Sequence, residues 1–113
     1  MDINAKIAPF RFLSYDDRNS LLLDVGDYKV ELFESRAEEG FEGNGYDWNS
    51  LAQVFVKEKA ADLAGDIGFD PEGSMFCAYS QNRAALEDFA LRFHAACEDD
   101  VLIRDLFSRA ELD

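Results

Sequence analysis

The chain is poor in the residues that catalytic and disulfide-stabilised proteins depend on. Its 113 residues include two cysteines, two prolines and one histidine. Cys77 and Cys97 do not form a Cys-x-x-Cys pair, and both lie in apolar surroundings. Free cysteine is among the most frequently buried residue types, so we expect two buried, reduced thiols.

Long hydrophobic runs are also missing. The longest purely aliphatic run is Leu21-Leu22-Leu23, which is far too short to span a bilayer. The opening residues Met1-Asp2-Ile3-Asn4 carry an acid where a secretory signal carries positive charge before an apolar run. We therefore expect a cytoplasmic protein that does not bind membranes.

Basic residues are scarce. There are 11 Lys and Arg against 24 Asp and Glu, which gives a formal net charge of -13. Such a field repels nucleic-acid phosphates and anionic lipids, so direct binding to either is disfavoured. It attracts a partner with a basic surface, at a rate that falls with salt. The alternative is that the acidity serves solubility alone.

Apolar residues, in contrast, are plentiful. They make up 48% of the chain and include ten phenylalanines. That content suffices for one hydrophobic core without disulfide or metal, and the length suits one domain over residues 1–113. We expect a folded chain despite its charge.

The first third of the chain predicts strands. Lys6 to Tyr15 suits an opening strand, and Asp16 to Asn19 has turn composition. From Ser20 to Glu34 the pattern predicts a hairpin closed by a type II′ turn at Gly26-Asp27. One face of this hairpin would collect Leu21, Leu23, Val25, Tyr28, Val30 and Leu32.

The rest of the chain predicts helices around a second hairpin. Helical spacing runs from an N-cap at Asp47 to about Asp62, from Asn82 to Cys97 behind a cap at Ser80, and from Val101 to Ala110. The second hairpin joins 66–70 to 74–79 through a turn at 70–73. The predicted order is βββ-α-ββ-αα, an α+β fold whose antiparallel sheet of about five strands has helices packed on one face.

The segment Glu38 to Trp48 must be a loop, because it holds three glycines, three aromatics and four carboxylates. Helical spacing places Trp48 in the core, whereas Phe41 and Tyr46 are expected to show at least an edge. Aromatic anchors with polar rims are typical of protein interfaces. The candidate binding residues are Glu38, Glu39, Phe41, Glu42, Tyr46 and Asp47.

Catalytic and metal sites have little support. His94 has Cys97 three residues away on a predicted helix, but no local signature of a Cys–His enzyme surrounds them. The loop Glu39 to Asp47 resembles a calcium loop superficially, yet it lacks the alternating acids and the closing glutamate. Glu42 with Asp47 is a nonspecific carboxylate pair. We predict no catalytic, cofactor-binding or metal residues; the alternative is a small enzyme with a carboxylate or Cys/His site.

Several motifs together resemble a known family. They are Glu42-Gly43-Asn44-Gly45-Tyr46-Asp47-Trp48 with Ser50-Leu51-Ala52, then Phe69-Asp70-Pro71-Glu72 and Met75-Phe76-Cys77-Ala78-Tyr79-Ser80. This pattern resembles immunity protein family 51 of bacterial polymorphic toxin systems. The resemblance implies a small α+β cytosolic antidote that neutralises a cognate toxin without catalysing a reaction.

The partner expected from resemblance and charge together is a toxin domain with a basic surface. The oligomeric state is left open between monomer and homodimer. A further alternative is a self-associating module, in which uncovered sheet faces carrying Leu22 and Phe33 pair between chains.

Overall fold

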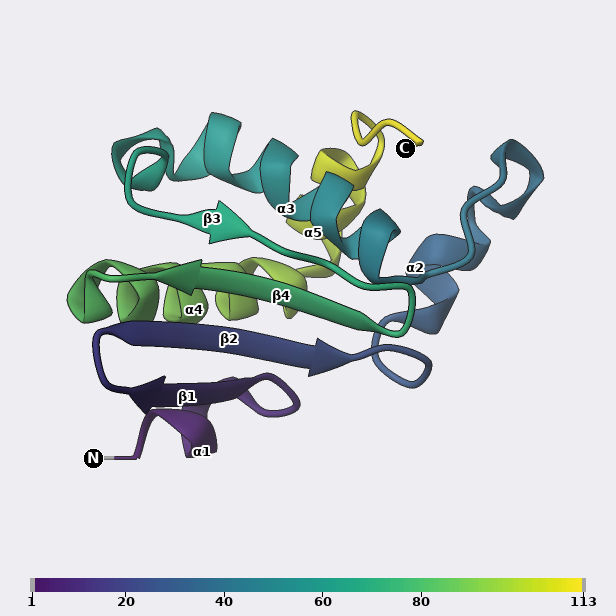
Figure 1. The fold of residues 1–113 in the computed structure, drawn as a ribbon. Coiled ribbons are helices and arrows are strands. Elements are labelled where there is room, and N and C mark those ends of the chain that lie inside the picture. Colours follow the sequence, from purple (N-terminus) through teal and green to yellow (C-terminus); the bar gives the residue numbers. More distant parts are fainter. Residues whose placement is uncertain (1, 113) are drawn as a thin grey trace.

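The protein is an α+β fold, described by a computed structural model over residues 2–112. Four strands form one antiparallel sheet in the order β1-β2-β4-β3 (Figure 1). Their bounds are β1 Arg11–Tyr15, β2 Arg18–Asp24, β3 Gly68–Phe69 and β4 Met75–Ser80. The predicted fold class is confirmed, and the expected strand number is close to the observed one.

The helices lie on one side of this sheet. They are α1 Ile3–Ile7, α2 Val30–Glu34, α3 Gly45–Lys59, α4 Arg83–Cys97 and α5 Asp100–Phe107, with 3-10 turns η1 Ala37–Glu39 and η2 Ala61–Leu63. Helix α4 lies behind β2 and β4, α3 runs past β3, and α5 contacts both long helices (Figure 1). Within residues 2–112, no helix covers the opposite face of the sheet (Figure 1).

Alternation along β2 and β4 builds the floor of the core. Leu21 pairs with Ala78 and Leu23 with Phe76, and all four side chains are buried on the helix side. Trp48, 1% exposed, packs over this floor. Its burial on the inner face of α3 agrees with the prediction from helical spacing.

The hairpin predicted for Ser20 to Glu34 is wrong. Strand β2 pairs with β1 on one edge and with β4 on the other, so no edge is left for residues 28–34. Those residues form α2, in which the consecutive side chains Leu32 and Phe33 are both buried; a strand would send them to opposite faces. The first hairpin instead closes earlier, at Asp16-Asp17, where Tyr15 pairs with Arg18.

The other boundaries need smaller corrections. The opening strand starts at Arg11, after the unexpected helix α1. Asn44, not Asp47, is the N-cap of α3, because its side chain accepts a hydrogen bond from Asp47 N–H. The predicted second hairpin and last two helices are present, although Asn82, not Ser80, is the N-cap of α4. The tight turn of that hairpin is Gly73-Ser74, since Glu72 and Met75 exchange backbone hydrogen bonds of 2.8 and 3.2 Å.

The outer edge of β1 is blocked by a side chain. Asn4 accepts a hydrogen bond from Phe12 N–H at 2.7 Å and donates one to Phe12 C=O at 3.2 Å. The amide of Asn4 thus takes the place of one residue of a neighbouring strand. Occupied edge groups disfavour edge-to-edge pairing with another chain.

Gly45 brings α3 directly onto the β3–β4 turn. Its N–H donates to Gly73 C=O at 3.1 Å. A Cβ atom at Gly45 would overlap the backbone oxygens of Glu72 and Met75. Backbone cannot yield as a flexible side chain does, so this contact requires glycine.

We predict that Gly45→Ala lowers the free energy of unfolding by about 3 kcal/mol, because the turn or the helix must shift. The matched control is Gly65→Ala, at a position where a Cβ meets nothing within 4 Å, and its expected effect is within about 0.5 kcal/mol. Urea denaturation measures both. Equal stabilities for the two variants would contradict the close packing at Gly45.

Candidate functional site

The six candidate binding residues divide into two groups. Phe41 and Asp47 are buried, each with 3% of its surface exposed. The prediction that Phe41 shows an edge is therefore wrong. Tyr46 is 43% exposed, as predicted, and Glu38, Glu39 and Glu42 are exposed.

Asp47 fixes the shape of the loop from within. Its Oδ2 accepts hydrogen bonds from Glu42 N–H at 2.7 Å and Gly43 N–H at 2.8 Å. The carboxylate lies in the first turn of α3, where negative charge is favourable. Asp47 therefore positions the loop and offers little surface to a partner.

Arg36 fastens the other end of the loop to α5. One guanidinium nitrogen, Nη1, donates to Phe107 C=O at 2.5 Å and to Ala110 C=O at 2.8 Å. The guanidinium lies 4.4 Å from the centroid of the Phe41 ring, and that ring packs edge-on against Phe107 at 5.0 Å. Phe41 is buried because this arginine and the end of α5 enclose it.

Glu39 is exposed but already paired. Its two carboxylate oxygens accept hydrogen bonds from Arg36 Nε at 2.8 Å and Nη2 at 2.7 Å. These hydrogen bonds lower the pKa of Glu39 from its ordinary value. Its charge is therefore largely balanced by Arg36.

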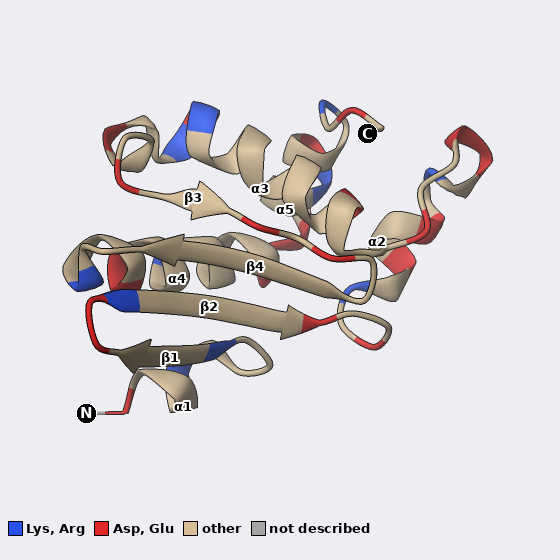
Figure 2. Ribbon diagram, viewed as in Figure 1, with Lys and Arg blue, Asp and Glu red and all other residues tan. Residues whose placement is uncertain are grey.

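Uncompensated negative charge gathers beside the loop. We call Glu31, Glu34, Glu38 and Glu42 the acidic face; all four are exposed and none forms an ion pair with another described residue. Figure 2 shows acidic segments along α2 and the loop after it. Asp27 to Asp47 holds seven carboxylates and two basic residues, and both basic residues pair with carboxylates.

Glu31 and Glu34 were missed by sequence reasoning because residues 28–34 were assigned to a strand. A helix instead exposes both positions while it buries the two residues between them. The signal that could have found them is the apolar pair Leu32-Phe33, which breaks strand alternation.

The cysteine–histidine alternative has an unfavourable geometry. Cys97 is fully buried, and burial raises the pKa of its thiol well above the ordinary value. The thiol therefore stays protonated, which is its unreactive form. His94 Nε2 lies 3.1 Å from Ala8 C=O. Neighbouring Glu98 accepts a hydrogen bond from the Tyr28 hydroxyl at 2.6 Å, which lowers the pKa of Glu98.

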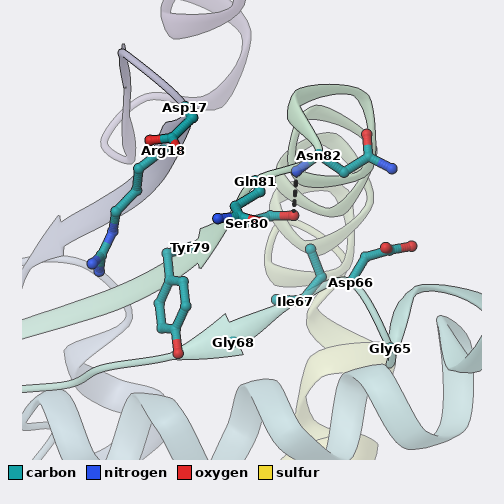
Figure 3. A pocket seen from close by; sticks show the side chains of 10 residues that line it. All are labelled: Asp17, Arg18, Gly65, Asp66, Ile67, Gly68, Tyr79, Ser80, Gln81 and Asn82. Carbon is teal, nitrogen blue, oxygen red and sulfur yellow. Dashed lines mark hydrogen bonds between the residues drawn. The ribbon is translucent and has the colours of Figure 1, made fainter.

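A surface hollow lies at the end of the sheet that is remote from the Glu38–Asp47 loop. Its volume is about 760 Å³, and it lies between the β1–β2 turn, the start of β3 and the start of α4 (Figure 3). Arg18 lies over the Tyr79 ring at 4.5 Å, and Ser80 Oγ accepts from Asn82 N–H at 2.9 Å. The lining has neither histidine nor cysteine. Its one serine, Ser80, already accepts the hydrogen bond from Asn82 N–H at the start of α4.

The described residues offer no support for a metal site or a membrane span. No group of three or more His, Cys, Asp or Glu within 2–112 is placed to hold a metal ion. None of the helices in that range has the length and apolarity needed to cross a membrane.

Comparison with known proteins identifies the family. The family model described as Immunity protein 51 matches residues 10–112. The chain belongs to the Immunity protein 51 family. Membership implies a toxin-neutralising role exercised by binding a toxin partner, which is not an enzymatic role. No curated protein and no solved structure matches the chain.

For an Immunity protein 51 member, the relevant site is a surface. The match includes the whole Glu38–Asp47 segment and the acidic face. Asp47 and Arg36 hold the backbone of this segment in place. The side chains of Glu38, Glu42 and Tyr46 remain exposed.

We predict that Arg36→Ala lowers the free energy of unfolding by about 2–4 kcal/mol, since it removes the two hydrogen bonds to the Phe107 and Ala110 carbonyls, the two to the exposed Glu39 carboxylate, and the cover of Phe41. Arg104→Ala is the control, because Arg104 is an exposed arginine of α5 without an ion pair to any described residue. Chemical denaturation checks both. If the two variants were equally stable, Arg36 would not fasten the loop.

Proposed function

We propose that this protein neutralises a cognate toxin domain by laying the acidic face and Tyr46 over a basic surface of the toxin. The observation that carries the proposal is the set of four exposed carboxylates that form no ion pair with another described residue, two in α2 and two in the loop region 38–42; Glu42 accepts one hydrogen bond, from the Asn44 side chain at 3.2 Å. Complementary charge speeds encounter and disfavours wrong partners.

Rigidity supports the same proposal. The loop is held by the Asp47 hydrogen bonds at one end and by Arg36 at the other. A surface that is ordered before binding loses less conformational entropy on association. Phe41, Asp47 and Glu39 then act as positioning residues, and Glu38, Glu42 and Tyr46 as contact residues.

Tyr46 supplies the apolar part of the proposed contact. It lies in the first turn of α3 and is 43% exposed. Tyrosine is enriched at interface centres because its ring buries a large area and its hydroxyl keeps a polar contact. Inhibition by covering requires no catalytic group, no cofactor and no contact with nucleic acid or membrane. We place the encounter in the cytoplasm.

A second candidate is self-association through the uncovered sheet face. Leu13 and Tyr15 are 42% and 60% exposed there, and Leu22 lies beside them, paired across the ladder with Arg11. Phe33, the other residue expected on such a face, is buried in α2 against Trp48. Sedimentation velocity at several concentrations distinguishes a monomer from a homodimer.

We predict that the double variant Glu38→Lys, Glu42→Lys weakens toxin binding about 100-fold, because two attractive contacts become repulsive. Glu39 is left unchanged, since its loss would release Arg36. Calorimetry with the toxin domain encoded beside this gene, in a catalytically inactive form, measures the affinity.

The control is Asp17→Lys, Asp66→Lys, which changes net charge equally at the far end of the sheet (Figure 3). We expect it to weaken binding only a few-fold. Equal losses in both variants would mean that total charge matters and the acidic face does not. Failure of the unaltered protein to bind the toxin would contradict the proposed function itself.

A further inference from the structure

We propose that a small pocket within the acidic face is a socket for one arginine side chain of the toxin partner; this inference rests on the proposed function. The pocket has a volume of about 120 Å³ and lies between the Gly26–Tyr28 loop, α2 and the Glu42-Gly43 backbone. Both Glu34 and Glu42 line it.

The size of the pocket selects a single side chain. A volume of 120 Å³ holds about four waters at roughly 30 Å³ each. Pockets for whole small molecules usually measure about 300–1,000 Å³. One inserted side chain at an interface centre is the geometry of a binding hot spot.

The lining selects a planar cation. Tyr28, Phe33 and Phe41 line the pocket, and of these rings only that of Tyr28 is more than 3% exposed; Glu34 and Glu42 are its acidic lining residues. Aromatic faces attract cations, and two carboxylates match the fork of donors on a guanidinium. A neutral apolar side chain would take water from both carboxylates without replacing their hydrogen bonds. Arginine is favoured over lysine because its flat group also stacks on rings.

The protein already shows this chemistry at Arg36. The Arg36 guanidinium stacks on the Phe41 ring at 4.4 Å while it forms two hydrogen bonds to Glu39. The socket offers a second guanidinium a comparable combination, the Tyr28 ring beside Glu34 and Glu42.

The walls are fixed before any partner arrives. Asp47 holds Gly43 N–H at 2.8 Å, and Arg36 covers Phe41. Gly43 has a φ of +78°, and a Cβ there would lie 3.4 Å from Phe33 Cβ. Glycine at this position therefore permits both the backbone turn and the open pocket.

The test fills the socket without changing charge. Ala37 lines the pocket, is exposed, and begins η1. Ala37→Phe should occupy the pocket. Ala61→Phe is the matched control, because Ala61 is likewise exposed and begins the other 3-10 turn, η2, outside the pocket lining. Equal melting temperatures for both variants and the unaltered protein establish that the fold is kept.

The first readout uses a small probe. N-acetyl-arginine amide is titrated into labelled protein, and N-acetyl-citrulline amide serves as its neutral counterpart. We expect the arginine probe to shift the amide signals of Gly26 and Gly43 in the unaltered protein and in Ala61→Phe, with at least tenfold weaker binding in Ala37→Phe. Equal shifts from the citrulline probe, equal binding by Ala37→Phe, or no shifts at these glycines would overturn the socket.

The second readout uses the toxin domain. Ala37→Phe should weaken toxin binding at least tenfold relative to Ala61→Phe. If the toxin binds all three proteins equally, the socket is wrong while the proposed function stands. If the toxin does not bind the unaltered protein, the proposed function fails, and the assignment of the socket to a toxin arginine fails with it.

Discussion

The packing of aromatic rings around Trp48 is the constraint on which the rest of the structure depends. Its ring lies within 6.4 Å of five others, and it is stacked parallel to Tyr28 at 5.9 Å. The five come from the segments before β1 and before α2 and from α2, β4 and α4: Phe10, Tyr28, Phe33, Phe76 and Phe93. Each aromatic pair adds stabilisation beyond the burial of apolar area. Through these pairs Trp48 joins strand β4 to α2, to α4 and to its own helix α3.

The candidate surface is built outward from that core. Phe33 holds α2 against Trp48 at a ring distance of 5.1 Å, which turns the glutamates of the same helix toward solvent. Phe41 and Asp47 then define the loop that follows. The aromatic and acidic residues of this loop thus have two different roles. Phe41 and Asp47 hold its conformation, and the proposed function assigns the exposed residues to the toxin contact.

Charge in this protein has two roles that depend on pairing. Glu39 is matched to Arg36, and Glu58 of α3 to Arg109, just after α5, at 2.6 Å, so these carboxylates stabilise contacts within the chain. Glu34 and Glu42 lack such partners among the described residues. The field of unpaired charge on a rigid surface extends into solvent. Under the proposed function, this field attracts a toxin partner of opposite charge.

The sequence by itself determined the long helices, the second hairpin and the family. Helical spacing located α3 and α4 and buried Trp48, because this pattern follows from backbone periodicity, and turn residues at 70–73 located the hairpin that contains β4. Only the tertiary structure decided that residues 30–34 are helical and that Phe41 is buried. Both outcomes depend on distant segments: β4 takes the free edge of β2, and the end of α5 brings Phe107 against Phe41. Long-range contacts of this kind override the local preference for strand or loop. The periodicity of the affected residues does not by itself predict these contacts.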